Sequence, residues 1–223
     1  MKKDIFVALD FNSLDRAIDV TKKIKNNIAG VKIGTELYAI CGIEGLKKFN
    51  ELGVEVFLDL KLHDIPNQVK KTVSAIASSR LVKYLTVHLS GDHEMLKAAK
   101  DSSDTLELLG VTVLTSQSNL SNIGIKNSVE SQIKLLINLA IKAKLAGVIA
   151  SGQDYQLVRS LSKQLKIFCP GIREGEAKQD QKRTMSYADF SRFADDKCFA
   201  VIGRPIIEGD PVQNIKKIIQ SLK

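Results

Sequence analysis

The stretch VFLDLKLHDIP, residues 56–66, begins as a buried strand and ends in charged residues. Three apolar residues open it, and Asp59, Lys61, His63 and Asp64 then fall within six positions. Burying a charge is costly unless a partner compensates it, so a core strand usually carries none. Because side chains alternate along a strand, Asp59 and Lys61 point to the same face, roughly 6–7 Å apart along it. The stretch therefore predicts a buried strand whose carboxyl end carries a functional site.

Similar apolar runs recur along the chain, with helix-period segments between most of them. The predicted strands are residues 4–9, 30–34, 54–60, 84–89, 108–114, 147–151, 166–171 and 198–203. Amphipathic helices are predicted at 13–28, 128–146 and 210–222, opened by a Ser13 cap, a capping-box pattern of Ser128 and Gln132, and Pro211.

Strict alternation of strands and helices implies parallel strands joined by right-handed crossovers. Eight such units in 223 residues fit a compact (β/α)8 TIM barrel, an α/β fold, with residues 1–223 as a single domain. A doubly wound open sheet is the alternative, but its usual GxGxxG turn is missing.

Composition favours a soluble protein in a reducing compartment. Cys41, Cys169 and Cys198 are odd in number and widely spaced, which is untypical of a disulfide framework. No apolar run reaches signal-peptide or membrane-spanning length, so we expect a cytoplasmic protein with no membrane partner. The three histidines, His63, His88 and His93, show no HExxH or similar spacing, and no metal site is predicted.

The net charge of +8 raises the alternative of a nucleic-acid-binding protein. The lysines are scattered over predicted helix faces, and the few aromatic residues are not interleaved with them. A stacking platform for bases needs both features together. We therefore expect a solvated, lysine-rich surface and no nucleic-acid partner.

Charges also stand at the ends of the first two predicted strands, where Asp10 follows one apolar run and Lys32 interrupts another. Barrel enzymes place their chemistry at the carboxyl ends of their strands, and neighbouring strands lie about 4.8 Å apart. We therefore expect Asp10, Lys32, Asp59 and Lys61 to form one alternating array of charges. Separate structural salt bridges are the alternative for each pair. Asp64 lies past the strand, where it could cap the next helix or reach across a dimer interface.

The last two strands are followed by PGIR (170–173) and IGRP (202–205). Barrels often bind phosphate with the loops after these strands, and glycine lets backbone N–H groups approach an anion. Arg173 and Arg204 add planar, bidentate donors. A polar stretch at 173–186 follows the seventh strand, and a loop of that length in a compact domain is usually functional or mobile.

Seven motifs together resemble the orotidine 5'-phosphate decarboxylase family over about residues 4–220. They are ALD (8–10), VKIG (31–34), DLKLHDIP (59–66), VTVLTS (111–116), PGIR (170–173), DQKR (180–183) and VIGRPI (201–206). The resemblance implies a (β/α)8 homodimer with active sites shared between subunits. It also implies a cofactor-free conversion of orotidine monophosphate to uridine monophosphate in pyrimidine synthesis.

The resemblance assigns a role to each matching position. Lys61 would donate the proton within a catalytic array of Lys32, Asp59, Lys61 and Asp64, the last supplied by the partner subunit. Asp10 and Lys32 would bind the ribose, and Thr115, with Ser116, would contact the pyrimidine. Arg173, Gln181, Gly203 and Arg204 would hold the phosphate beneath the 173–186 loop. Ile65, Gln68 and Pro170 would complete the substrate site.

Two positions depart from the family pattern. Gln68 stands where many members have Thr, which affects the expected ribose contact from the partner subunit. HLSGD (88–92) replaces the commoner HASGG.

The related sugar-phosphate branch, which includes 3-keto-gulonate-phosphate decarboxylase and hexulose-phosphate synthase, is the nearest alternative. Its members share the DxKxxD core but use Mg2+ and tend to carry an acidic residue at the Lys32 position. A lysine there repels a divalent cation, which favours the decarboxylase of orotidine monophosphate.

Overall fold

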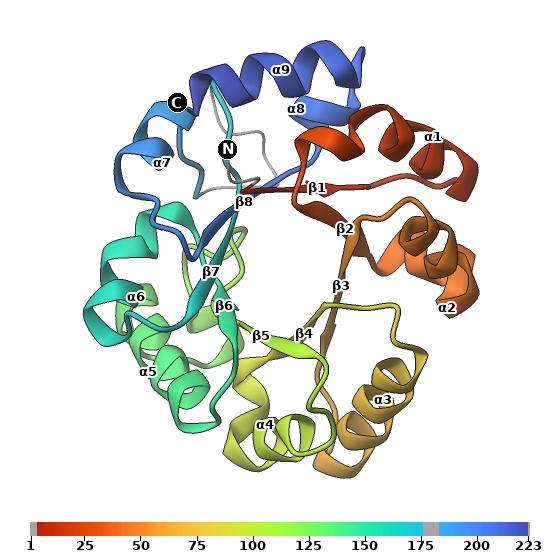
Figure 1. Ribbon diagram of the computed structural model, residues 1–223. Coiled ribbons are helices and arrows are strands. Elements are labelled where there is room, and N and C mark those ends of the chain that lie inside the picture. The colour runs from red at the N-terminus through yellow and green to blue at the C-terminus, as the bar shows by residue number, and fades with distance from the viewer. Residues whose placement is uncertain (1–3, 176–182, 223) are drawn as a thin grey trace.

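A computed structural model of the chain, in which residues 4–175 and 183–222 are described, is a closed parallel barrel (Figure 1). Its strands follow one another in chain order, and β1 pairs with β8 to close the ring. The strands are β1 (Ile5–Ala8), β2 (Gly30–Gly34), β3 (Glu55–Leu62), β4 (Tyr84–His88), β5 (Glu107–Val111), β6 (Gly147–Ile149), β7 (Lys166–Pro170) and β8 (Cys198–Ile202). The TIM-barrel prediction is confirmed, and closure excludes the open doubly wound sheet.

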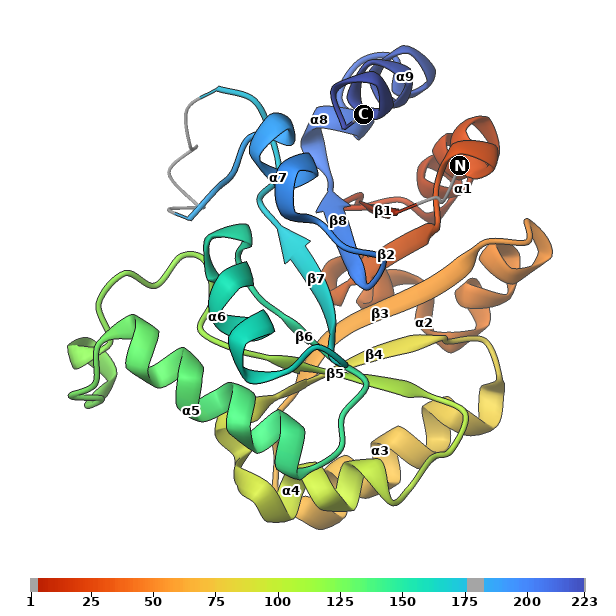
Figure 2. The same ribbon diagram turned by 60° about the vertical axis from the view of Figure 1, so that its left-hand side comes forward.

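Helices surround the barrel on its outside, as both ribbon views show (Figure 2). The α-helices are α1 (Leu14–Ile24), α2 (Thr35–Glu51), α3 (Pro66–Ser79), α4 (Asp92–Lys100), α5 (Val129–Lys142), α6 (Tyr155–Leu161), α7 (Tyr187–Phe193), α8 (Arg204–Ile207) and α9 (Pro211–Ser221). Short 3-10 turns are η1 (Lys25–Asn27), η2 (Leu89–Gly91), η3 (Ser121–Ile123) and η4 (Gly152–Asp154).

Each predicted strand lies within two or three residues of an observed one, and β3 differs in an informative way. It continues to Leu62, two residues beyond the predicted end, so that Asp59 and Lys61 lie inside it. The pairing of β3 with β4 shifts register between Leu58 and Leu62. Charged residues at the end of β3 therefore remain part of the barrel wall.

Helix starts follow the local chemistry of their caps. The side chains of Ser13 and Ser128 accept hydrogen bonds from backbone N–H groups at the starts of α1 and α5, as predicted. The capping box is wrong in its second half, because the Gln132 side chain accepts a hydrogen bond from Asn127 instead of closing on Ser128. Gln132 is four residues after the cap, one position too far along the helix for the reciprocal bond.

The core has two layers. The larger one lies between the barrel and its helices, and a smaller one fills the barrel interior with Phe6, Ala8, Phe57, Tyr84, Leu109, Phe168 and Val201. The ring centroids of Phe6 and Phe168 lie 5.2 Å apart. A Cβ on Gly30 would lie 2.6 Å from the Phe6 ring, so glycine makes room for this aromatic filling. The interior is thus a packed floor, and the site above it cannot extend through the barrel.

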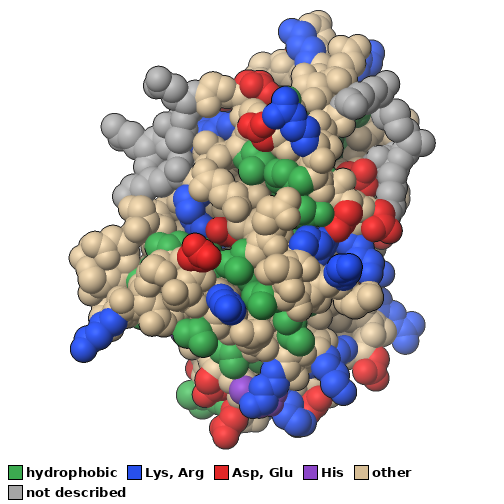
Figure 3. Space-filling model, turned by 90° about the vertical axis from the view of Figure 1, so that its left-hand side faces the viewer, with side chains coloured by type: hydrophobic (Ala, Val, Ile, Leu, Met, Phe, Trp, Pro, Cys, Tyr) green, Lys and Arg blue, Asp and Glu red, His purple; other side chains and the backbone are tan. Residues whose placement is uncertain are grey.

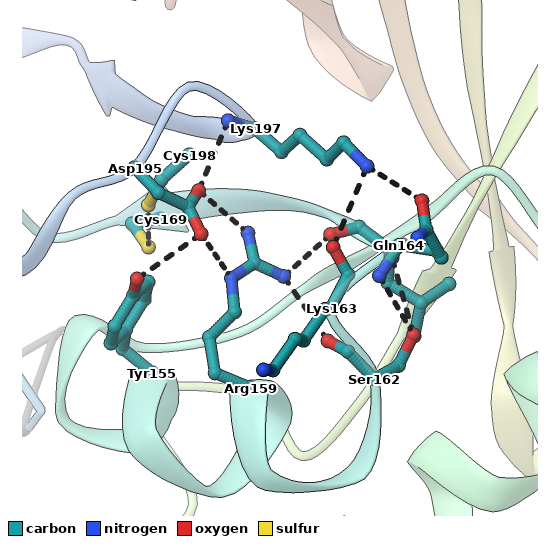
Figure 4. Close-up of polar contacts among 10 residues, drawn as sticks. Tyr155, Arg159, Ser162, Lys163, Gln164, Cys169, Asp195, Lys197 and Cys198 are labelled. Carbon is teal, nitrogen blue, oxygen red and sulfur yellow. Dashed lines mark hydrogen bonds and ion pairs between the residues drawn. The ribbon is translucent and has the colours of Figure 1, made fainter.

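Polar networks hold the barrel together below and beside this floor. Glu107 pairs with Lys166 and Lys83 near the amino-terminal ends of the strands. Figure 4 shows the Arg159 guanidinium bonded to Asp195 and to the carbonyls before β7. These bonds connect α6 to the segment that precedes β8.

Surface charges are mixed. On the face drawn in Figure 3, Lys and Arg side chains lie among acidic and apolar ones and form no continuous stripe. Within residues 4–175 and 183–222, no helix combines the length and apolar character needed to cross a membrane.

Candidate active site

The inward-facing residues of β1, β2 and β3 become charged toward the carboxyl end of the barrel. Phe6 and Ala8 lead to Asp10 after β1, and Phe57 leads to Asp59 and Lys61 on β3. Register explains how these rows meet, since Ala8 pairs with Lys32 and Lys32 with Phe57. Alternation along the strands therefore places acidic and basic side chains directly above an aromatic floor.

The structure brings four predicted residues into one array. The Lys32 ammonium lies 3.5 Å from Asp10 Oδ1 and 3.7 Å from Asp59 Oδ2. The Lys61 ammonium donates a hydrogen bond of 2.8 Å to the same Asp59 oxygen. Side chains of Lys32 and Asp59 are 14% and 13% exposed, whereas that of Lys61 is 38% exposed and reaches into the cavity. The buried carboxylate is thus held between two ammonium groups, one of them accessible to a ligand.

Asp59 is ionised more readily than an ordinary aspartate. Burial alone would raise its pKa, but Lys32 and Lys61, with hydrogen bonds from Lys61 and Thr86, outweigh burial and lower the pKa. The array therefore keeps a fixed negative charge beside Lys61.

Thr86 belongs to this array, although the sequence analysis did not identify it. Its hydroxyl donates a 3.0 Å hydrogen bond to Asp59 Oδ1 and accepts a 2.8 Å bond from the Lys61 backbone N–H. The side chain is fully buried. A polar residue in the apolar run YLTVHL was the available signal.

A cavity of about 980 Å3 opens beside the array. Among its lining residues are the predicted Asp10, Lys32, Asp59, Lys61, Thr115, Pro170, Arg173, Gly203 and Arg204. Arg173 is only 8% exposed. A Cβ on Gly203 would come within 3.3 Å of Asp10 Oδ2, so a side chain there would crowd the start of the array. The expected phosphate end and the charge array therefore share one cavity.

Other predicted residues do not line this cavity. Asp64, Ile65 and Gln68 are exposed beyond the end of β3, and Ser116 is exposed in the loop after β5. The Asp64 carboxylate accepts a hydrogen bond from the Ile65 backbone N–H and does not cap α3. Gln181 lies outside the described residues, as does half of the 173–186 loop (residues 176–182). Within one barrel, Asp64, which the family resemblance implies as the fourth catalytic residue beside Lys32, Asp59 and Lys61, is thus absent from the site.

The cavity wall also includes polar side chains that no motif in the sequence predicted. Asn12, Arg16, Glu36 and Ser151 line it, each in a loop or helix start just after a strand. Nearby, Arg183 bonds Asp154 at 2.7 Å and the Val113 carbonyl at 2.8 Å. This joins the end of the loop after β7 to the segments after β5 and β6. Such long-range pairs leave no local pattern in a sequence.

Two histidines stand beside the accessible lysine. The rings of His63 and His88 stack with centroids 5.4 Å apart. Burial, together with electrostatic repulsion from His63 and Lys61, lowers the pKa of His88. In the described parts of the chain, no three His, Cys, Asp or Glu side chains group as ligands of a metal ion.

Comparison with known proteins covers almost the whole chain. A family model described as "Orotidine 5'-phosphate decarboxylase / HUMPS family" matches residues 3–218. An orotidine 5'-phosphate decarboxylase of Ehrlichia chaffeensis is 40% identical over 225 residues, which covers 98% of this chain and 96% of the relative. One from Wolbachia pipientis is 40% identical over 224 residues, with 98% of both chains covered.

Solved structures agree in architecture. The crystal structure of orotidine 5'-phosphate decarboxylase from Lactobacillus acidophilus matches with a TM-score of 0.84 and 26% identity, and both chains are covered completely. An orotidine 5'-monophosphate decarboxylase from Methanocaldococcus jannaschii, complexed with the inhibitor BMP, has the same fold, with a TM-score of 0.83 at 21% identity over all of both chains.

Proposed function

The chain belongs to the orotidine 5'-phosphate decarboxylase / HUMPS family, and on that premise we propose that it decarboxylates orotidine 5'-phosphate to uridine 5'-phosphate without a cofactor. The observation that carries this proposal is Lys32, whose ammonium lies 3.5 Å from Asp10 and 3.7 Å from Asp59. A divalent ion between these carboxylates would be repelled by that ammonium. The position thus favours the metal-independent decarboxylase over the Mg2+-dependent sugar-phosphate branch.

Lys61 is the proton donor in this proposal. Loss of CO2 breaks the bond from C6 and leaves the electron pair in the ring plane, where the ring π system cannot delocalise it. An ammonium held at that point stabilises the developing charge and then transfers a proton to C6. Asp59 supports the role, because its 2.8 Å hydrogen bond orients the Lys61 ammonium. The net reaction consumes one proton and releases uridine 5'-phosphate and CO2.

The rest of the substrate would occupy the shared cavity. Asp10 and Lys32 bind the ribose hydroxyls, Thr115 contacts the pyrimidine, and Arg173, Gly203 and Arg204 receive the phosphate together with Gln181. Phosphate contacts far from C6 contribute binding energy that favours closure of the cavity around the substrate. Closure excludes water from the reacting carbon.

A second subunit completes the site in this proposal. Asp64 is exposed and lies outside the cavity of its own barrel, as do Ile65 and Gln68. A twofold dimer can bring these residues to the neighbouring cavity, since an isologous interface exchanges the same surface between the two copies. A cytoplasmic homodimer acting in pyrimidine synthesis is the corresponding assembly.

The decisive experiment follows the absorbance of orotidine 5'-phosphate as purified protein consumes it in the presence of EDTA. We expect turnover at the same rate with and without the chelator. Lys61→Ala protein, purified identically, controls for a contaminating decarboxylase. Activity that needs Mg2+, or that acts on a ketogulonate or hexulose phosphate instead, would assign the chain to the sugar-phosphate branch.

A further inference from the structure

Thr86 stands at the centre of β4 and is fully buried. Its hydroxyl donates to Asp59 Oδ1 at 3.0 Å and accepts from the Lys61 backbone N–H at 2.8 Å. A hydroxyl can donate one hydrogen bond and can also accept. The donated bond and the accepted bond of Thr86 both go to residues of β3. Thr86 thus contacts the side chain of one array residue and the backbone of another.

An irregularity in β3 explains why a side chain is needed there. From Leu58 to Leu62 the strand advances four residues, while β4 advances only two, from Leu85 to Val87. Thr86 lies opposite the extra residues. Lys61 has φ +50°, a left-handed conformation that costs a non-glycine residue free energy. Since the regular ladder is interrupted, the Lys61 N–H finds a side-chain oxygen in place of a backbone carbonyl.

The Asp59 carboxylate is held from both sides. Thr86 bonds Oδ1, and the Lys61 ammonium bonds Oδ2, which also lies 3.7 Å from Lys32. Contacts on both oxygens fix the plane of the carboxylate, and this plane sets the direction of the Lys61 ammonium. Without the hydroxyl, Oδ1 would lose its threonine donor in a buried site, which is costly for a charged group.

We infer that Thr86 is a positioning residue of the decarboxylation site, acting through Asp59 and through the left-handed backbone of Lys61. This inference rests on the proposed function for its kinetic consequence, but its structural part stands independently. Thr86 does not line the cavity, so it acts on the reaction only through these two residues.

The test compares Thr86→Val, which removes the hydroxyl at nearly constant volume, with Thr86→Ser, which retains it. We expect kcat of the valine variant to fall about 10²-fold with KM changed little, as for a misplaced catalytic group. In the profile of kcat against pH, the fall in rate on the acidic side should also move to higher pH, because the charged form of Asp59 loses a hydrogen-bond donor. The serine variant should restore both rate and pH profile.

A matched control is Thr21→Val on α1. Thr21 is also fully buried, and its hydroxyl donates a 2.7 Å bond to the Ala17 carbonyl, away from the cavity. The control should lose thermal stability while kcat and its pH profile remain those of the wild type. Equal kinetic effects in the two valine variants would overturn the inference. Thr86→Ala repeats the comparison if Thr86→Val does not fold.

Hydrogen exchange at the Lys61 amide separates this inference from the proposed function. We expect the amide to be protected in the wild type and in Thr86→Ser, and to exchange faster in Thr86→Val while its neighbours in β4 stay protected. Unchanged protection would overturn the inference even in an active enzyme. If the three proteins show these exchange rates but the wild type does not consume orotidine 5'-phosphate, only the proposed function is refuted.

Discussion

The Lys61 ammonium donates a 2.8 Å hydrogen bond to Asp59, which lies two residues earlier on the same strand. The two residues occupy an irregular part of β3, and Lys61 has a left-handed backbone. A long side chain can fold back over such a short separation and leave its charged end at the cavity. The pair thus joins a buried negative charge to an accessible proton donor.

Removal of the donor is the first prediction. We expect Lys61→Ala to lower kcat by at least about 10³-fold, since both charge stabilisation and proton transfer are lost. The fold should persist, because the Lys61 side chain is 38% exposed and its truncation to alanine leaves the apolar core intact. Spectrophotometric rates and thermal unfolding check the two parts. Substantial residual activity would exclude Lys61 as the donor.

The phosphate end gives a second prediction. Arg204→Ala should reduce kcat/KM for orotidine 5'-phosphate about 10²-fold, the effect of losing a charge-assisted contact of roughly 1.5–3 kcal/mol. The nucleoside orotidine serves as the control substrate, and its slow turnover should hardly change. An equal loss with both substrates would place Arg204 away from the phosphate.

The position of Asp64 gives a third prediction. Lys61→Ala and Asp64→Ala proteins should each be nearly inactive, because each change damages every site of a dimer. Mixed and re-equilibrated in equal amounts, they should recover about a quarter of wild-type activity, since half of the dimers carry one intact shared site. No recovery, in a mixture that forms heterodimers by native mass spectrometry, would exclude a partner-supplied Asp64.

Acid sensitivity follows from Asp59. Its pKa in the folded protein is lowered from the ordinary 3.8, so its ionised form stabilises the fold above that pH. This stabilisation is lost as the pH falls through the lower folded value. Between pH 6 and pH 3, the free energy of unfolding should therefore decrease less in Asp59→Asn than in the wild type. Denaturant titrations at both pH values measure this, and parallel decreases would contradict it.

A change at Arg159 should affect the stability of the protein without affecting its catalysis. Its side chain is 11% exposed and is bonded to Asp195 and to the Leu165 carbonyl. Arg159→Ala should reduce the free energy of unfolding by about 1–3 kcal/mol, because the half-buried Asp195 carboxylate and the carbonyl of buried Leu165 lose their donor. Since Arg159 is not among the cavity residues, kcat/KM below the melting transition should stay unchanged. A loss of kcat/KM without a loss of stability would contradict this separation.

Local patterns in the sequence determined the fold class. Apolar runs separated by helical segments predicted the eight strands, and the barrel follows because parallel strands need crossovers. Charges at the ends of those runs predicted Asp10, Lys32, Asp59 and Lys61, because alternation along a strand is a local property.

Only the tertiary structure decided how these charges are held. Thr86 reaches Asp59 because of the register between β3 and β4, and the left-handed φ of Lys61 follows from the irregularity between Leu58 and Leu62. The bond between Arg183 and Asp154 joins residues 29 positions apart in the chain. Register and long-range contact depend on the packing of whole elements against each other, and no short stretch of sequence contains that information.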